Sequence, residues 1–98
     1  QGKNGRFSIT PTALKIEETI IEMESGGVKN CHQMSHSSGE IGCRGYLSTT
    51  WRNYSQDILG YTPERTKINE RYVTLKKIQQ FLEEGYGSRD IFLIWNPL

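Results

Sequence analysis

The sequence predicts an all-α, or at least α-dominated, domain, and three observations support this prediction. Apolar residues recur at helical spacing, most clearly Tyr72, Leu75, Ile78, Phe81 and Leu82. Residues that favour helix starts precede such runs, and glycines follow them. The chain has 98 residues, of which 35% are apolar and 23% charged, a balance typical of one folded domain with a modest core.

The first helix is expected over TPTALKIEETIIEME, which starts at Thr10. Thr10 can cap this helix, and Pro11 suits the first helical position, where its missing N–H costs nothing. Gly26 and Gly27 then offer the left-handed conformation that ends many helices.

A long structured loop is expected over residues 28–47, which carry three glycines and many Ser, His and Asn residues. A loop of about 20 residues inside a compact domain is more often functional than idle. Within it, the stretch IGCRGYL is compatible with a short strand or a turn. A second helix is expected over TTWRNYSQDIL, with Ser48 as its cap and Gly60 as its stop.

The C-terminal third predicts further helices. A third helix is expected to start at Thr62–Pro63, with an interruption or restart at Asn69, and to end at Gly85. Ser88 can cap a last segment, RDIFLIWN, which is apolar almost all round and is expected to be a buried helix rather than a strand. The sequence thus predicts four or five helices around a polar loop.

Charge and hydropathy exclude two classes of protein. The net charge is +1, and Lys and Arg are scattered among acids, which argues against a nucleic-acid binder. No apolar run approaches the roughly 20 residues that a membrane-spanning helix needs. The first residues, QGKNGRFSIT, lack the apolar stretch of a signal peptide. We therefore expect a cytosolic protein, or a mature or excised domain.

Cys31 and Cys43 lie twelve positions apart. A disulfide between them would add roughly 2–3 kcal/mol in an oxidising compartment, and two free thiols are the alternative. His32 and His36 lie in the same stretch, so these four side chains are candidate zinc ligands. The spacing C-H-x3-H-x6-C matches none of the usual paired-ligand patterns, and no metal is expected.

Glu24 is the first candidate for a functional residue. On a helical wheel of about 100° per residue it falls near the middle of the apolar arc of the first helix. An acid there loses hydration on packing, which raises the pKa of a carboxyl group, and the negative end of the helix dipole acts in the same direction. A proton held near neutral pH is what a general acid requires. Two observations favour an ordinary role: side chains in a last turn reach water, and Glu17 falls in the same arc.

Three segments in their order resemble the lytic transglycosylase and goose-type lysozyme group: ESGG (24–27), GEIGCRGYLSTTW (39–51) and, after a long amphipathic helix, IFLIWN (91–96). The resemblance runs from about residue 13 to residue 98. It implies that residues 1–98 form a single small lysozyme-like helical domain, either whole or excised from a larger protein. It also implies that the glycine-rich loop lines a glycan groove and that no cofactor is needed.

The resemblance also assigns roles to individual residues. Glu24 matches the catalytic acid of the family, and Ser25 matches the serine that helps to orient it. Gly39 and Gly42 match glycines of the groove loop, and Trp51 matches an aromatic residue that is expected to be structural.

Two positions depart from the family pattern. Trp95-Asn96 stands where the family has Tyr-Asn, and an indole can donate a hydrogen bond but cannot accept one as a tyrosine hydroxyl does. The family's Leu-Met-Gln appears as Cys43-Arg44-Gly45, so the sugar-contacting glutamine is missing at Gly45. Arg44 and Tyr46 are the candidates to compensate for it.

The activity implied is cleavage of the β-1,4 bond between N-acetylmuramic acid and N-acetylglucosamine in peptidoglycan, by a monomer that binds glycan strands. Such a protein would be extracytoplasmic: secreted, periplasmic, or part of a phage or cell-wall machine. That setting would also let Cys31 and Cys43 pair. The alternatives are an inactive peptidoglycan-binding or assembly module, a hydrolytic lysozyme that uses Glu40 as second acid, and a helical protein-interaction domain.

Overall fold

The computed structural model describes residues 8–26 and 46–95, with the side chain of Ser25 excepted. These residues form four helices: α1 (Pro11–Ser25), α2 (Ser48–Leu59), α3 (Lys67–Glu83) and α4 (Ser88–Trp95). No strand occurs among them. The predicted all-α class is therefore confirmed.

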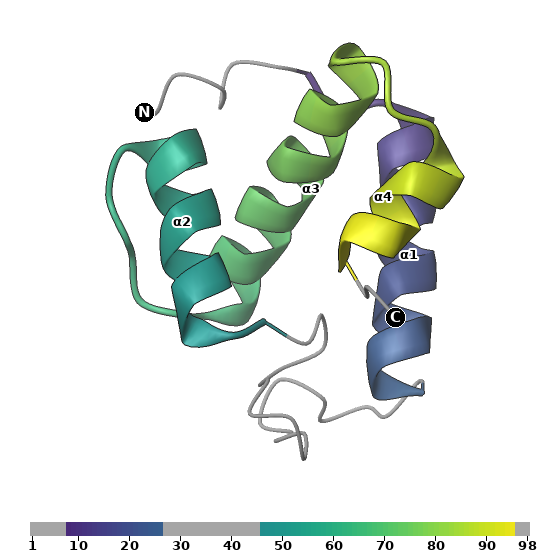
Figure 1. Cartoon of the computed structure of the whole chain (residues 1–98). Helices are drawn as coiled ribbons and strands as arrows, with labels where there is room; N and C mark the ends of the chain where they lie inside the picture. Colours follow the sequence, from purple (N-terminus) through teal and green to yellow (C-terminus); the bar gives the residue numbers. More distant parts are fainter. Residues whose placement is uncertain (1–7, 27–45, 96–98) are drawn as a thin grey trace.

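Helix α3 lies at the centre, with α2 against one side and α1 and α4 against the other (Figure 1). The C-terminal end of α1 and the N-terminal ends of α2 and α3 lie at one end of the molecule, the lower end in Figure 1, and α4 points its C-terminal end toward it. Glu24 and Trp95 are therefore carried toward the same end, although 70 residues separate them in the chain.

Two core clusters hold the helices together. The first joins α1, α3 and α4 and consists of Ala13, Ile16, Ile20, Ile78 and Ile91. The second joins α2 and α3 and consists of Tyr46, Trp51, Ile58 and Val73. Full burial of one such side chain contributes about 1.5–3 kcal/mol. Trp95 packs against both clusters, so it connects the two halves of the core.

The ends of α1 form as the local sequence predicts. The Thr10 hydroxyl accepts a hydrogen bond from the Ala13 N–H at 3.4 Å, and Pro11 is the first helical residue. The same hydroxyl donates to Gln79 Oε1 at 2.8 Å, which ties the start of α1 to α3. Gly26 ends the helix with φ of 63°, and Gly60 ends α2 in the same left-handed region.

Three predicted helix starts were wrong. Ser48 is the first residue of α2 and not its cap, since Leu47 occupies the cap position without a side-chain hydrogen bond. Ser88 is likewise the first residue of α4. Helix α3 begins at Lys67, not at Thr62–Pro63, because the Thr66 hydroxyl accepts from the Asn69 N–H at 3.1 Å and caps the helix there. Asn69 lies inside the first turn and neither interrupts nor restarts the helix.

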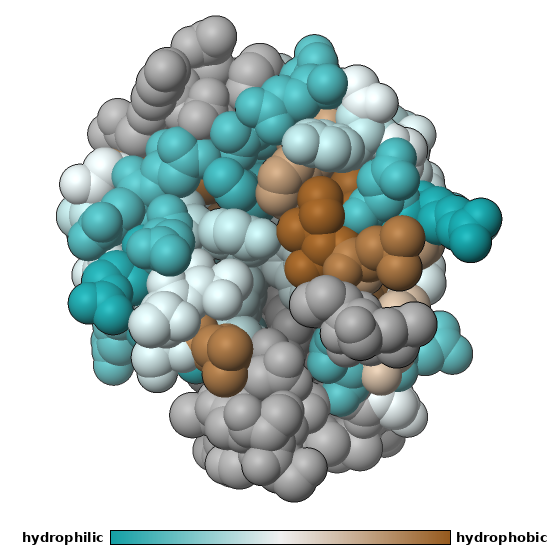
Figure 2. All heavy atoms as spheres, in the orientation of Figure 1, coloured by the Kyte–Doolittle hydropathy of each residue, from teal (hydrophilic) through white to brown (hydrophobic). Residues whose placement is uncertain are grey.

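The predicted burial of the last helix was only partly correct. Ile91 is buried and Phe92 and Trp95 are half-buried, whereas Leu93 and Ile94 are exposed. A helix of eight residues that packs on one side of α1 and α3 can bury only one of its faces. Figure 2 shows the resulting apolar patch over α4.

Candidate functional site

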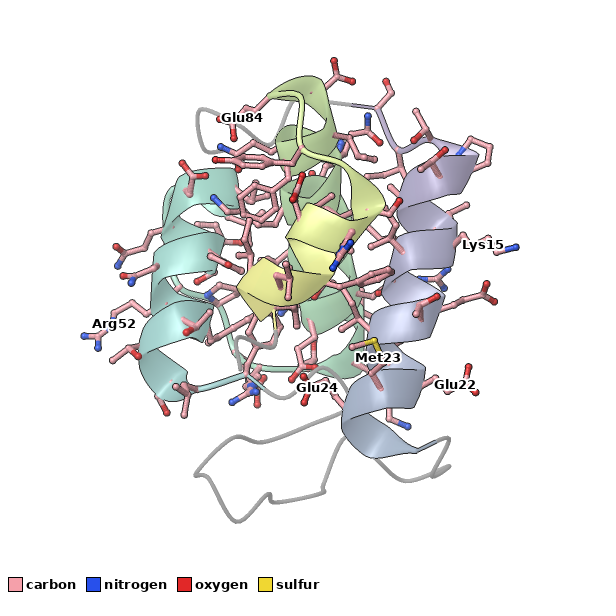
Figure 3. The ribbon with its side chains drawn as sticks, turned by 45° about the vertical axis from the view of Figure 1, so that its right-hand side comes forward. Lys15, Glu22, Met23, Glu24, Arg52 and Glu84 are labelled. Atoms are coloured by element: carbon pink, nitrogen blue, oxygen red, sulfur yellow. The ribbon has the colours of Figure 1, made fainter. Side chains whose placement is uncertain are left out.

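Glu24 lies in the last turn of α1, one residue before the helix ends at Ser25. Its side chain points to the side of α1 that faces the other helices, whereas Lys15 and Glu22 point away from the molecule (Figure 3). Glu24 is half-buried and Glu22 is exposed. Two acids in one helical turn therefore meet different surroundings.

The other acid of the apolar arc, Glu17, has a different environment. It is only 4% exposed and pairs with Arg71 of α3, with 3.7 Å between Oε1 and Nε. A substrate in solution does not reach such a side chain. Glu17 therefore ties α1 to α3, and Glu24 is the acid of this face that keeps partial access to solvent.

Tyr46 lies in the core and not on the surface. It is 2% exposed, and its hydroxyl lies 2.7 Å from Thr74 Oγ1. Its ring packs at centroid distances of 5.5 Å from Trp51 and 5.6 Å from Trp95. The Tyr46 side chain is therefore covered from solvent, and one of the rings that cover it belongs to Trp95, another predicted site residue.

An ion pair that the sequence analysis missed lies beside Tyr46. Arg65 Nε donates to Glu70 Oε2 at 2.8 Å, and Arg65 Nη2 donates to the Tyr46 carbonyl oxygen at 3.1 Å. The guanidinium carbon also lies 5.6 Å from the centre of the Tyr46 ring. The sequence contains a pattern that could have predicted this pair: a basic residue lies just before a helix start, and an acid lies five positions later in the first turn.

Several predicted site residues lie outside the described part of the chain: Gly39, Glu40, Gly42, Arg44, Gly45 and Asn96, the cysteines Cys31 and Cys43, and the side chain of Ser25. Over residues 8–26 and 46–95, no group of three or more His, Cys, Asp or Glu residues could hold a metal ion. No helix in this part is long and apolar enough to cross a membrane.

In the part of the chain that the structure describes, two open pockets lie along α1. One, of about 490 Å³, lies between the first turns of α1 and α4, where Pro11, Ile16 and Phe92 contribute to its wall. The other, of about 530 Å³, is lined by residues of α1 from Lys15 to Glu22 and by Gly26. Glu24 lines neither of them, since it points to the opposite side of the helix.

No protein-family model, curated protein or solved structure matches this chain.

Proposed function

We propose that this chain is a lytic transglycosylase that cleaves peptidoglycan glycan strands, with Glu24 as its general acid and base. The observation that supports this most is the place of Glu24: the last turn of α1, half-buried, on the inward side, two residues before the left-handed glycine that ends the helix. A carboxyl group there can hold a proton and still meet a substrate.

The reaction needs one carboxyl group. Glu24 donates its proton to the oxygen that links the two sugars, and the bond from that oxygen to C1 of N-acetylmuramic acid breaks. The carboxylate so formed takes the proton of the C6 hydroxyl, whose oxygen then bonds to C1. The product is a 1,6-anhydro sugar, and Glu24 regains its proton. Glycosidases that use water need two carboxyl groups at set separations.

The remaining residues support this centre. Ser25 would orient Glu24, and Gly42 would let the loop approach the sugar. Arg44, Trp95 and Asn96 would contact the glycan, and Tyr46 would act by holding Trp95. Such an enzyme works outside the cytoplasm, as a monomer on glycan strands and without a cofactor.

The test is digestion of purified peptidoglycan by the wild type, Glu24→Gln and Glu22→Gln, with the fragments weighed by mass spectrometry. Glu22→Gln is the matched control, because it makes the same change two residues earlier on the exposed side of α1. We expect fragments one water lighter than hydrolysis products from the wild type and from Glu22→Gln, and none from Glu24→Gln. Cleavage that persists in Glu24→Gln would refute the proposal. Fragments with the full mass of hydrolysis products would instead indicate a lysozyme. Glu40 would then be tested first as the second catalytic acid.

An inactive peptidoglycan-binding module is the second candidate, and the absence of the family's glutamine at Gly45 favours it. Co-sedimentation with insoluble peptidoglycan distinguishes the two. Binding by the wild type with no fragments released at any pH would support the binding module over the enzyme.

A further inference from the structure

The seam between α1 and α4 is open where the two helices begin. Helix α4 has eight residues against the fifteen of α1 and crosses α1 at an angle, so it covers only part of that helix (Figure 1). The space that remains, here named the α1–α4 groove, has a volume of about 490 Å³. Pockets that bind small molecules have volumes of about 300–1,000 Å³, so the groove is large enough to hold one.

The lining of the α1–α4 groove is mainly apolar. Pro11, Ile16 and Phe92 contribute to it, and of these Ile16 is buried and Phe92 half-buried. Ile16 and Phe92 also pack in the core cluster of α1, α3 and α4, which fixes their positions whether or not the groove is filled. A sugar in this groove would lose hydrogen bonds to water without replacing them, whereas an apolar chain would gain from leaving water. The groove therefore suits an apolar chain.

Hydroxyl groups complete the lining. Thr12 lies in the first turn of α1, and Ser88 is the first residue of α4. The third hydroxyl, that of Thr19, donates to the Lys15 carbonyl oxygen at 3.0 Å. Among the described residues, no hydrogen bond engages the hydroxyls of Thr12 and Ser88, so both can donate to a ligand.

Lys15 gives the groove a positive charge. Its carbon stem lines the groove, and its side chain extends away from the molecule (Figure 3). No described residue forms an ion pair with Lys15, and its flexible stem lets the ammonium group turn toward a bound anion. None of the lining residues is acidic. The nearby carboxylate of Asp90 accepts a hydrogen bond from the Gly87 N–H at 3.2 Å. The charge of the groove therefore favours a negative group on the ligand.

We propose that the α1–α4 groove binds a free medium-chain fatty acid. The chain lies on the apolar lining, and the carboxylate lies at Lys15, where the hydroxyls of Thr12 and Ser88 donate to it. Burial of the chain supplies the affinity, and the charge of Lys15 selects an anion over a cation of the same length. Glu24 does not line the groove, so this inference does not depend on the proposed function. For a small ligand in an open groove we expect a dissociation constant of about 0.1–1 mM.

The experiment is an NMR titration with dodecanoate and, separately, with dodecyltrimethylammonium, each below its critical micelle concentration. The two probes share one chain and differ in the sign of their charge. We expect the backbone amide signals that shift to be those of the lining residues and their neighbours, and dodecanoate to bind more tightly. Lys15→Glu should weaken the binding of dodecanoate about tenfold and reverse the preference between the probes. Because Lys15 is exposed, this change should leave the fold intact, which far-UV circular dichroism would check.

Lys67→Glu is the matched control. It makes the same change in net charge at the first residue of α3, which lies at the other end of the molecule (Figure 1). This variant should keep the wild-type preference for dodecanoate.

Four results would overturn the inference. Equal affinities of the wild type for the two probes, or equal losses in Lys15→Glu and Lys67→Glu, would show that Lys15 does not select the ligand. Shifts spread over the whole protein would indicate general binding of amphiphiles. Shifts of the groove residues that follow protein concentration without any ligand would assign the groove to a second copy of the chain. Shifts that occur only with anionic phosphatidylglycerol vesicles would assign it to a membrane surface.

Discussion

Ile78 allows the sharpest test of how the fold presents Glu24 and Trp95. It is fully buried in the cluster that joins α3 to α1 and α4, the two helices that carry these residues. Replacement of a buried isoleucine by alanine costs about 2–5 kcal/mol, and the cost grows with the cavity that remains. Because three helices enclose Ile78, we expect little collapse and a loss of about 3–4 kcal/mol. For a domain of this size the melting temperature should fall by about 12–32 °C.

The matched control lies on the same helix. Ile68 is 81% exposed, so Ile68→Ala should change the free energy of unfolding by no more than about 0.5 kcal/mol. Thermal and urea unfolding, followed by far-UV circular dichroism, would measure both variants. If Ile78→Ala lost no more stability than Ile68→Ala, the packing of α1 and α4 on α3 would not be what stabilises the fold.

Two further predictions concern single residues. Gly26→Ala should destabilise the fold by about 1–2 kcal/mol in urea unfolding, because φ is 63° and an added Cβ would meet no atom within 4 Å that could offset the strain. Gly87→Ala, outside the left-handed region, should cost less, and equal costs would contradict this reasoning. Burial raises the pKa of Tyr54 above its ordinary value of 10.0. The buried neutral phenol therefore contributes fully to the free energy of unfolding below that pH, and this contribution is lost as pH rises through the pKa of the folded state. The stability advantage of wild type over Tyr54→Phe should therefore shrink above about pH 10, unlike that over Tyr61→Phe, whose ring is exposed.

The helical class and the ends of α1 could be predicted because they depend on local chemistry. At α1 the Thr10 cap, Pro11 in the first helical position and Gly26 in the left-handed conformation all form as the local sequence predicts, whereas Thr62–Pro63 does not start a helix. The start of α3 could not be predicted in this way, since Thr62 and Thr66 offer similar caps. Thr66 serves as the cap, and Asn69 strengthens that choice by donating from its side chain to the Glu64 carbonyl oxygen at 2.8 Å. Bonds of this kind depend on the folded geometry of several residues at once.

The site shows the same division between local and tertiary information. A helical wheel places Glu17 and Glu24 on one face, but only the position of α3 decides that Glu17 is covered and paired while Glu24 is half-exposed. The burial of Tyr46 and its link to Arg65 also depend on α3, which begins 21 residues after Tyr46. The helical wheel and the motifs therefore identify candidate residues, and only the tertiary contacts show which of these candidates are buried in the core.

This division bears on the missing glutamine at Gly45. Arg44 and Tyr46 were the two candidates to replace its contact with the sugar. Tyr46 lies in the core, where its hydroxyl is hydrogen-bonded to Thr74 and its carbonyl oxygen accepts from Arg65. Of the two, Arg44 alone keeps that assignment. A charged donor makes stronger hydrogen bonds than a neutral amide, but a guanidinium cannot accept one. An active enzyme built on this chain would then bind its glycan through a charged donor where the family it resembles uses a neutral amide. Because salt screens charged contacts, its affinity for glycan would fall as the salt concentration rises, whereas the affinity that a neutral amide provides would not.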